Sequence, residues 1–256
     1  MIKTARTIAV LSDIHGVLPV LDAVLDEPSV RASDLIVVTG DHAAGPQPAA
    51  VLDRLASLGG HALLVKGNAD RDLVALARGT YADAEPVAID RWAAEQLTQQ
   101  HIAMLDDLPH PATVHISGFG DVLFCHGTPR NDNEVVLVDS RLDWWREVLT
   151  GVGPDVRAVV CGHTHMPFVR LLDGRWAVNS GSVGMPYGSP LAPWALIDEH
   201  GISLRWTAVE PEAIAEAVIS GSSYPLVREW VNEYLLNRAS DGDAIAAFGP
   251  RDGRPS

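Results

Sequence analysis

The chain has 256 residues, of which 47% are hydrophobic and 20% charged, with a formal net charge of −14 at pH 7. This composition suits one large globular α/β domain with appendages. The acidic balance excludes non-specific binding to nucleic acid, which needs a basic surface. No apolar stretch is long enough to span a bilayer, and no apolar signal segment precedes the first strand. We therefore expect a cytoplasmic protein that binds no membrane.

The N-terminal part of the chain alternates between two kinds of apolar pattern. Short apolar runs predict strands near 7–12, 34–39 and 61–66, and helices are expected near 18–28 and 47–58. Such alternation is typical of a parallel sheet with right-handed crossovers. A helical insertion follows at about 70–110, where the apolar stripe of Trp92, Leu97, Ile102 and Leu105 predicts two helices.

From residue 112 onward, strands and glycine-containing turns dominate. The predicted strands are 112–117, 121–126, 156–161, 167–172, 175–179, 192–198 and 202–208, and a helix is expected near 139–150. This order fits a four-layer αββα sandwich of two mixed sheets, formed by residues 1–208. Extra C-terminal helices are expected within 209–238.

The C-terminal region leaves one alternative open. The apolar face of a helix over 224–238 either packs on the domain or forms a contact in a homodimer. Residues 239–256 are rich in Gly, Pro, Asp and Arg, and this composition predicts a disordered tail.

Polar motifs follow most of the predicted strands. They are Asp13-Ile14-His15, Gly40-Asp41, Gly67-Asn68-Ala69-Asp70, Cys125-His126-Gly127, Gly162-His163-Thr164-His165 and Asn179-Ser180-Gly181-Ser182-Val183. Side chains at the carboxyl ends of adjacent strands converge on one crevice. In an extended backbone, the two-residue spacing of Asp13 and His15, and of His163 and His165, would direct each pair to the same side.

These side chains suit a dinuclear metal site, because imidazole and carboxylate groups bind divalent transition metals well. Two sites result if Asp41 bridges them. The first would comprise Asp13, His15, Asp41 and His165, and the second Asp41, Asn68, His126 and His163. Two metals about 3.5–4 Å apart can clamp the oxygens of a phosphoryl group and lower the pKa of a bridging water to about 7. This chemistry favours hydrolysis of a phosphate ester or anhydride by a metal-bridging hydroxide.

The ordered motif set resembles the calcineurin-like metallophosphoesterase superfamily across residues 7–208. The resemblance implies the αββα sandwich, the bridging carboxylate and two divalent transition metals. Mn²⁺ is the expected ion in vitro, with Fe, Zn²⁺, Ni²⁺ and Co²⁺ as alternatives. The segment from Asn179 to Val183 is similar to a small bacterial and archaeal branch that has been linked to phosphodiesterase and diadenosine-tetraphosphatase-like activities.

One departure from the superfamily pattern bears on catalysis. Many members carry a histidine at the position of Ala69, and that histidine is thought to protonate the leaving oxygen. Its absence implies substrates with good leaving groups or a substitute donor. His42 is the candidate donor on position, and the alternative places it behind the ligands or in solvent. Asp70 is expected to orient a ligand histidine through its ring N–H.

Arginine offers a further way to hold the substrate. Arg130, or Arg71, either grips a phosphate oxygen in bidentate fashion or pairs with a nearby Asp at the surface. The expected substrate is a small phosphate ester or a nucleotide-like molecule. A protein Ser/Thr phosphatase is one alternative, weakened by compact insertions and the missing histidine. A catalytically weak scaffold subunit of the same fold is another, weakened by the presence of all seven predicted ligands.

Overall fold

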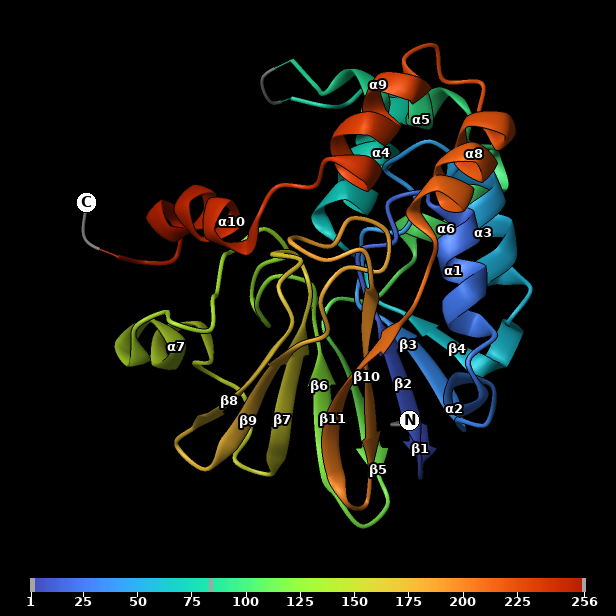
Figure 1. Cartoon of the computed structure of the whole chain (residues 1–256). Helices are drawn as coiled ribbons and strands as arrows, with labels where there is room; N and C mark the ends of the chain where they lie inside the picture. The colour runs from blue at the N-terminus through green and yellow to red at the C-terminus, as the bar shows by residue number, and fades with distance from the viewer. Residues whose placement is uncertain (1–2, 83–84, 255–256) are drawn as a thin grey trace.

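Two mixed β-sheets stack face to face in the computed structural model, which describes residues 3–82 and 85–254 (Figure 1). The five-stranded sheet has the order β11-β10-β2-β3-β4, built from β2 (Ile8–Leu11), β3 (Leu35–Val38), β4 (Ala62–Leu64), β10 (Ala192–Asp198) and β11 (Gly201–Thr207). The six-stranded sheet has the order β1-β5-β6-β7-β9-β8, built from β1 (Lys3–Ala5), β5 (Ala112–Ile116), β6 (Gly120–Phe124), β7 (Val156–Cys161), β8 (Phe168–Leu172) and β9 (Arg175–Asn179). The predicted αββα sandwich with extra C-terminal helices is confirmed.

The central strands of each sheet are parallel, so their carboxyl ends lie on the same side of the sheet. Strand β2 pairs in parallel with β3, and β3 with β4, while β6, β7 and β9 form a second parallel run. Antiparallel strands β10 and β8 adjoin these runs. The parallel strands of each sheet therefore deliver their following loops to one edge of that sheet.

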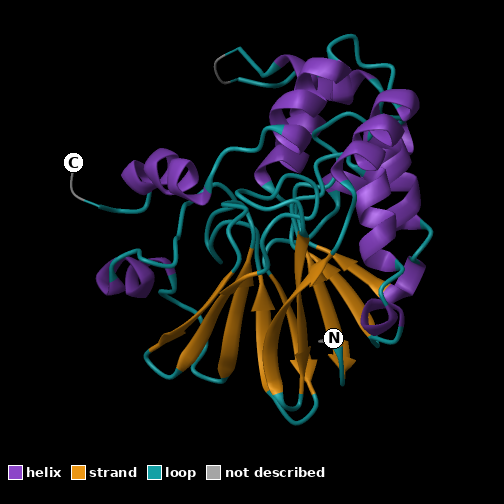
Figure 2. Ribbon diagram, viewed as in Figure 1, coloured by secondary structure: helices purple, strands orange, loops and turns teal. Residues whose placement is uncertain are grey.

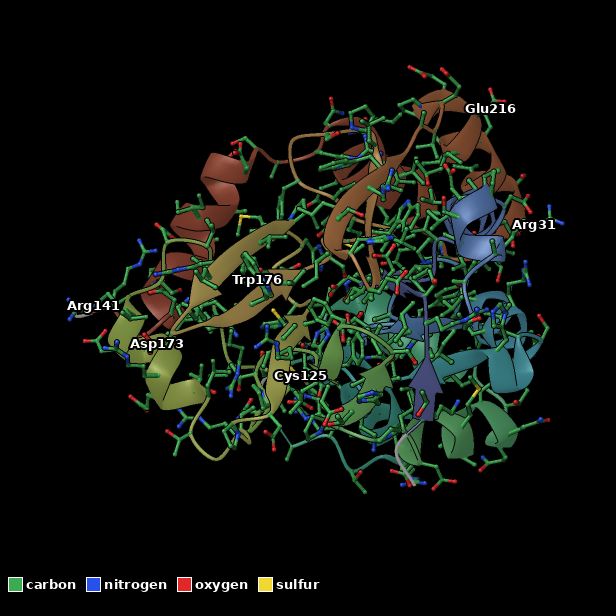
Figure 3. All side chains as sticks on the ribbon, turned by 90° about the horizontal axis from the view of Figure 1, so that it is seen from below. Arg31, Cys125, Arg141, Asp173, Trp176 and Glu216 are labelled. Carbon is green, nitrogen blue, oxygen red and sulfur yellow. The ribbon has the colours of Figure 1, made fainter. Side chains whose placement is uncertain are left out.

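The inner faces of the two sheets form a single apolar cluster. Val10 and Val37 from one sheet pack in it with Phe124 and Val160 from the other, and all four are fully buried. Branched and aromatic side chains suit this position because they fill a pleated surface well. Seen from below, Cys125 lies in the interior, while Arg31 and Arg141 mark opposite sides of the periphery (Figure 3).

Helices cover both outer faces. On the five-stranded sheet these are α1 (Leu18–Leu25), α2 (Pro28–Arg31), α3 (Pro48–Ala56) and α8 (Pro211–Gly221), and a 3₁₀ turn, η1 (Gly59–His61), precedes β4. On the six-stranded sheet, Trp145 and Val148 of α7 (Leu142–Val148) pack in one cluster with Val159 and Phe168. No helix among residues 3–82 and 85–254 is both long and apolar enough to cross a membrane.

The helical insertion contains three helices where two were predicted. They are α4 (Asn68–Arg78), α5 (Ala88–Glu95) and α6 (Gln99–Asp106). Gly79 ends α4 in the left-handed conformation, with φ of 68°. Thr98 starts α6 as an N-cap whose side chain accepts a hydrogen bond from the backbone N–H of His101. Residues 83 and 84 of the predicted insertion lie outside the described part of the chain.

The sequence left open whether the apolar face of residues 224–238 packs on the domain or forms a dimer contact. Trp230 and Val231 of α9 (Val227–Val231) and Leu235 of the π-helical turn η2 (Asn232–Leu236) are buried in the same cluster as Leu21 of α1. The apolar face of this segment therefore packs on the domain.

The tail differs from the sequence prediction of disorder over 239–256. Helix α10 (Asp241–Phe248) and a 3₁₀ turn, η3 (Gly249–Arg251), occupy it, and residues 255–256 lie outside the described chain. Ser240 caps α10 by accepting a hydrogen bond from the backbone N–H of Asp243. The buried carboxylate of Asp252 accepts a hydrogen bond of 2.7 Å from the Ser140 hydroxyl. Composition alone does not reveal such long-range anchors.

Candidate metal centre

The predicted ligands meet where the loops gather at one end of both sheets (Figure 2). Asp13 and His15 follow β2, Asp41 follows β3, Asn68 begins α4 after β4, His126 follows β6, and His163 and His165 follow β7. Each sheet therefore supplies part of the site. The residues form two groups, Asp13 with His15 and His165, and Asp41 with His126 and His163. Within each group, the candidate ligand atoms all lie within 4.8 Å of one another.

Three of the histidines are held in one ring orientation by backbone carbonyl groups. The Nδ1 atoms of His15, His126 and His165 lie 3.1, 2.7 and 2.9 Å from the carbonyl oxygens of Ala44, Thr39 and Met185. Since a carbonyl oxygen only accepts, each Nδ1 carries the hydrogen in these bonds. When such a ring is neutral, its Nε2 lone pair is available to a metal, which is the usual support of a histidine ligand.

The Nε2 atoms point into the space between the carboxylates. His165 Nε2 lies 3.3 Å from Asp13 Oδ1, and His126 Nε2 lies 3.2 Å from Asp41 Oδ2. Asp41 Oδ2 is also 3.8 Å from His15 Nε2, so this carboxylate lies between the two groups as a bridging ligand would. Asn68 Oδ1 is 3.1 Å from His126 Nε2 and joins the second group.

The chemistry of this donor set fits divalent metal ions. His163 Nε2 is buried and has no hydrogen-bond partner among the described residues, although unpaired buried polar atoms are costly. Asp13 and Asp41 are almost completely buried beside imidazole nitrogens, with side chains 0% and 5% exposed. The site thus combines two buried carboxylates with several imidazole nitrogens. This combination of ligands binds Mn²⁺, Fe²⁺ and Zn²⁺.

The ligand loops adopt a strained backbone, which corrects the extended geometry expected from the two-residue spacing. Five ligands have positive φ angles: Asp13 at 52°, His15 at 48°, Asp41 at 53°, His163 at 67° and His165 at 59°. Non-glycine residues rarely adopt the left-handed region, and such strain gathers at functional sites. The side chains therefore converge because the loops turn sharply, and not because alternate residues share one side of a strand.

Two glycines let these loops approach one another. A Cβ atom on Gly40, which has φ of 107°, would lie 2.5 Å from His126 Nδ1. A Cβ atom on Gly67 would lie 2.2 Å from Asp41 Oδ1. Both distances are shorter than van der Waals contact, so a larger residue at either position would displace a ligand.

Backbone hydrogen bonds tie the ligand loops together. The N–H groups of Asp13 and His15 donate to the carbonyl oxygens of Gly40 and Asp41, each at 3.0 Å. From the Asn-Ser-Gly-Ser-Val segment, the Ser182 hydroxyl donates to the Asp13 carbonyl at 2.7 Å, and Asn179 Nδ2 donates to the Gly162 carbonyl at 2.6 Å. That motif supports the ligand loops and contributes no residue to either ligand group.

Comparison with known proteins identifies the family of this chain. A sequence model described as the calcineurin-like phosphoesterase superfamily domain matches residues 7–200. The chain belongs to the calcineurin-like phosphoesterase superfamily. An uncharacterised protein of Methanocaldococcus jannaschii is 26% identical over 252 residues, which cover 90% of this chain and 97% of that protein.

Two solved structures share the fold. A metallophosphoesterase from Sphaerobacter thermophilus superposes with a TM-score of 0.69 at 23% identity, covering 89% of this chain and 98% of its own. A hypothetical protein from Pyrococcus horikoshii superposes with a TM-score of 0.73 at 19% identity, covering 88% and 97%. Each superposition covers most of both chains, so the fold is shared with these two proteins.

The contacts of Asp70 in this superfamily member differ from those expected. It is fully buried, and its carboxylate accepts hydrogen bonds from the backbone N–H groups of Gly67, Asp41 and His42 at 2.8, 3.0 and 3.0 Å. A fourth contact, of 2.8 Å, joins it to Nδ1 of His42, which is in neither ligand group. Asp70 thus holds the loop that carries Asp41 instead of orienting a ligand histidine.

His42 is buried behind the ligand loop. Its side chain is 0% exposed, and its Nε2 atom has no hydrogen-bond partner among the described residues. A donor to the leaving oxygen must touch the substrate. The burial of His42 therefore favours the reading in which it lies behind the ligands.

The arginines proposed to hold phosphate are engaged with carboxylates. Arg130 bonds Glu134 and Glu147 at 2.7 and 3.1 Å, which matches the surface-pair alternative except that its partners are Glu rather than Asp. Arg71 pairs with Asp132 and Asp72. Neither guanidinium is free for a substrate in this arrangement.

Several residues near the centre were not identified from the sequence. The rings of Tyr187 and Phe248 lie 5.7 and 6.0 Å from those of the ligand histidines His165 and His163. His110 Nε2 accepts a hydrogen bond of 3.2 Å from the backbone N–H of His126. No strand-end motif marks these residues, and Phe248 lies in the segment predicted to be disordered.

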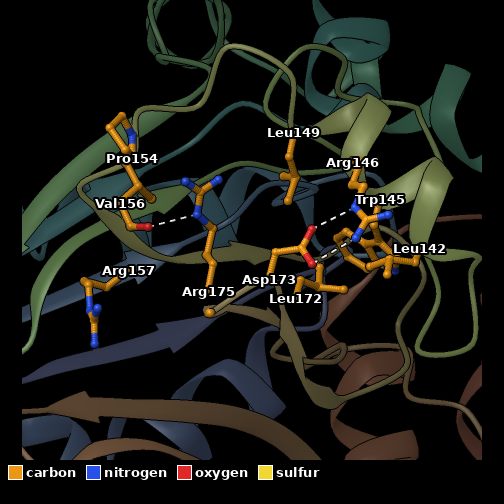
Figure 4. Close-up of a pocket in the computed structure, with 11 residues that line it drawn as sticks. Leu142, Trp145, Arg146, Leu149, Pro154, Val156, Arg157, Leu172, Asp173 and Arg175 are labelled. Carbon is orange, nitrogen blue, oxygen red and sulfur yellow. Dashed lines mark hydrogen bonds and ion pairs between the residues drawn. The ribbon is translucent and has the colours of Figure 1, made fainter.

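A cavity of about 270 Å³ lies elsewhere, between α7 and the outer face of the six-stranded sheet (Figure 4). Its lining includes Trp145, Arg175 and the ion pair between Arg146 and Asp173. None of the metal-ligand residues lines it, so it is separate from the candidate reaction site.

Burial and neighbouring charges shift the pKa values of two ligand histidines, His163 and His126, in opposite directions. Burial, together with positive charge on His126, lowers the pKa of His163 to about 3. Burial acts in the same direction on His126, but the carboxylates of Asp41 and Asp13 outweigh it and raise the pKa of His126 to about 10. The pKa of Asp41 is held well below its usual range, since the interaction with His126 outweighs burial. In the metal-free protein, His126 therefore carries a proton at neutral pH.

Metal binding at pH 7 is expected to release about one proton, from His126, because a ligand imidazole must be neutral. Protons compete with the metal at His126, so the apparent affinity for Mn²⁺ should rise with pH across the neutral range. Titration calorimetry in two buffers of different ionisation enthalpy measures this release. Equal heats in both buffers would contradict the proton state inferred for His126.

Proposed function

We propose that this protein is a dinuclear metal-dependent phosphoesterase that hydrolyses a phosphodiester or phosphoanhydride bond in a small or nucleotide-like substrate. The two adjoining ligand groups carry this proposal, with Asp41 lying between them and the buried Nε2 of His163 left unpaired. Membership of the calcineurin-like phosphoesterase superfamily supports the reaction class.

The ligand residues would have two roles in binding the metal ions. Asp13 and Asp41 supply negative charge, and the histidine Nε2 atoms supply neutral lone pairs directed by carbonyl bonds. Bound cations would lower the pKa of a water molecule and neutralise charge on the phosphoryl oxygens. The hydrogen bonds between the loops fix the ligands in advance, so little reorganisation is needed during the reaction.

Metal removal and reconstitution test the proposal. Protein stripped with a chelator should not hydrolyse bis(p-nitrophenyl) phosphate, and added Mn²⁺ should restore turnover. Parallel assays with p-nitrophenyl phosphate measure the preference for a diester over a monoester. Binding of two equivalents of metal without turnover of either compound or of the anhydride ADP, with Mn²⁺, Fe²⁺, Zn²⁺, Ni²⁺ or Co²⁺, would overturn the proposal and favour the scaffold alternative.

A further inference from the structure

A pocket of about 230 Å³ adjoins the metal centre on the side of the C-terminal helices. We call it the Arg238 pocket, and its lining includes His165, Met185, Tyr187, Glu233, Tyr234 and Arg238. His165 belongs to a ligand group and also lines the pocket, so the two sites share a wall. A molecule with one group at the centre can therefore extend into the pocket.

Aromatic side chains supply part of the lining. The Tyr187 ring lies 5.7 Å from the His165 ring, and the Tyr234 ring lies 5.2 Å from the Trp230 ring. Packing against these neighbours holds both tyrosines in place. Planar rings such as nucleobases stack on aromatic faces, and this stacking tolerates different bases.

Arg238 is the unusual member of the lining. It is half-buried, and its Nε atom is buried without a hydrogen-bond partner among the described residues. Burial lowers the pKa of its guanidinium, and no carboxylate within residues 3–82 and 85–254 offsets that effect. Glu233 is exposed and bonds the Tyr234 side chain. Partial burial of an unpaired cation is unfavourable, so an anionic ligand would supply the partner that the Arg238 Nε atom lacks.

The surroundings of the centre bear on the leaving group. Ala69, next to the ligand Asn68, offers no proton, and His42 is buried against Asp70. A leaving oxygen that receives no proton must be a stable anion when it departs. A phosphate group leaves in this way far more readily than an alkoxide does.

Resting on the proposed function, we propose that the substrate is a nucleotide-like phosphoanhydride whose leaving group occupies the Arg238 pocket. The scissile phosphate lies at the centre, the neighbouring phosphate pairs with Arg238, and the planar ring stacks on Tyr187 or Tyr234. The oxygen of water forms the new P–O bond, and the bridging P–O bond of the anhydride breaks. The electron pair leaves with the phosphate on Arg238, and the proton of the attacking water passes to solvent.

Kinetics of Arg238→Gln in the Mn²⁺-loaded full-length protein test this assignment. The KM for ADP should rise by about 10- to 100-fold, the value of a charge-assisted hydrogen bond. Turnover of bis(p-nitrophenyl) phosphate, whose leaving group carries no phosphate, should change by a much smaller factor than the KM for ADP. Arg238→Lys should recover part of the affinity, and the exposed Arg228→Gln is the matched control.

Binding separates the inference from the proposed function. The dissociation constant of AMP for the metal-free protein should rise in Arg238→Gln and stay unchanged in Arg228→Gln. Hydrolysis of bis(p-nitrophenyl) phosphate combined with an unchanged KM for ADP would overturn the inference and leave the proposed function standing. Failure to hydrolyse both bis(p-nitrophenyl) phosphate and ADP would count against the proposed function. AMP binding that does not depend on Arg238 would overturn the inference.

Discussion

Asp41→Asn is expected to lower kcat/KM for bis(p-nitrophenyl) phosphate by about 10³-fold in the Mn²⁺-loaded protein, equivalent to several kcal/mol of metal-derived stabilisation. Asp41 is the carboxylate between the two ligand groups, with Oδ2 at 3.2 Å from His126 Nε2 and 3.8 Å from His15 Nε2. Asparagine keeps an acceptor for the N–H of Ala69, which Asp41 Oδ1 binds at 2.9 Å. The substitution therefore removes charge with little change of shape.

A matched control separates this effect from a general loss of acidity. Asp173→Asn changes an exposed carboxylate that pairs with Arg146, well away from the ligand groups (Figure 4). Its kcat/KM should equal that of the unmodified protein. The bridging role of Asp41 would be refuted by Asp41→Asn protein that binds two equivalents of Mn²⁺ and retains full activity.

Asp70→Ala is expected to destabilise the protein by about 3–5 kcal/mol, as removal of one partner from a buried charged network does. The substitution leaves the backbone N–H groups of Gly67, Asp41 and His42, together with the His42 ring, without their acceptor. The loop that carries Asp41 should then lose its fixed conformation, so metal affinity should fall as well.

Urea denaturation of the metal-free proteins measures this change in the free energy of unfolding. Asp72→Ala is the comparison on the same helix, because Asp72 is partly exposed and pairs with Arg71 at the surface. That substitution should cost less than about 1 kcal/mol. Equal stability of the Asp70→Ala and unmodified proteins would show that Asp70 does not hold the loop.

The features that the sequence predicts well are local. Apolar runs such as Ile8–Leu11 and Leu35–Val38 form buried strands because neither face of a parallel strand meets solvent. Ligands placed directly after those strands then reach a common edge, as Asp13 and Asp41 do. Strand order and motif position were therefore enough to predict the sandwich and the convergence of these side chains.

Features that depend on distant contacts escaped prediction. The left-handed backbone of Asp13 and His15 depends on hydrogen bonds to another loop, at Gly40 and Asp41. Asp252 is anchored to Ser140, more than a hundred residues away in the sequence, and this contact orders a tail whose composition indicates disorder. The environment of Arg238 arises from packing between separate segments, which spacing does not encode.

Anomalous diffraction from crystals grown with Mn²⁺ tests the dinuclear centre most directly. Two ions are expected about 3.5–4 Å apart, the spacing of two-metal hydrolytic sites. One ion should be bound by Asp13, His15 and His165, the other by His126, His163 and Asn68, with Asp41 between them. A single ion at this position, or manganese bound only at other residues, would contradict a dinuclear centre.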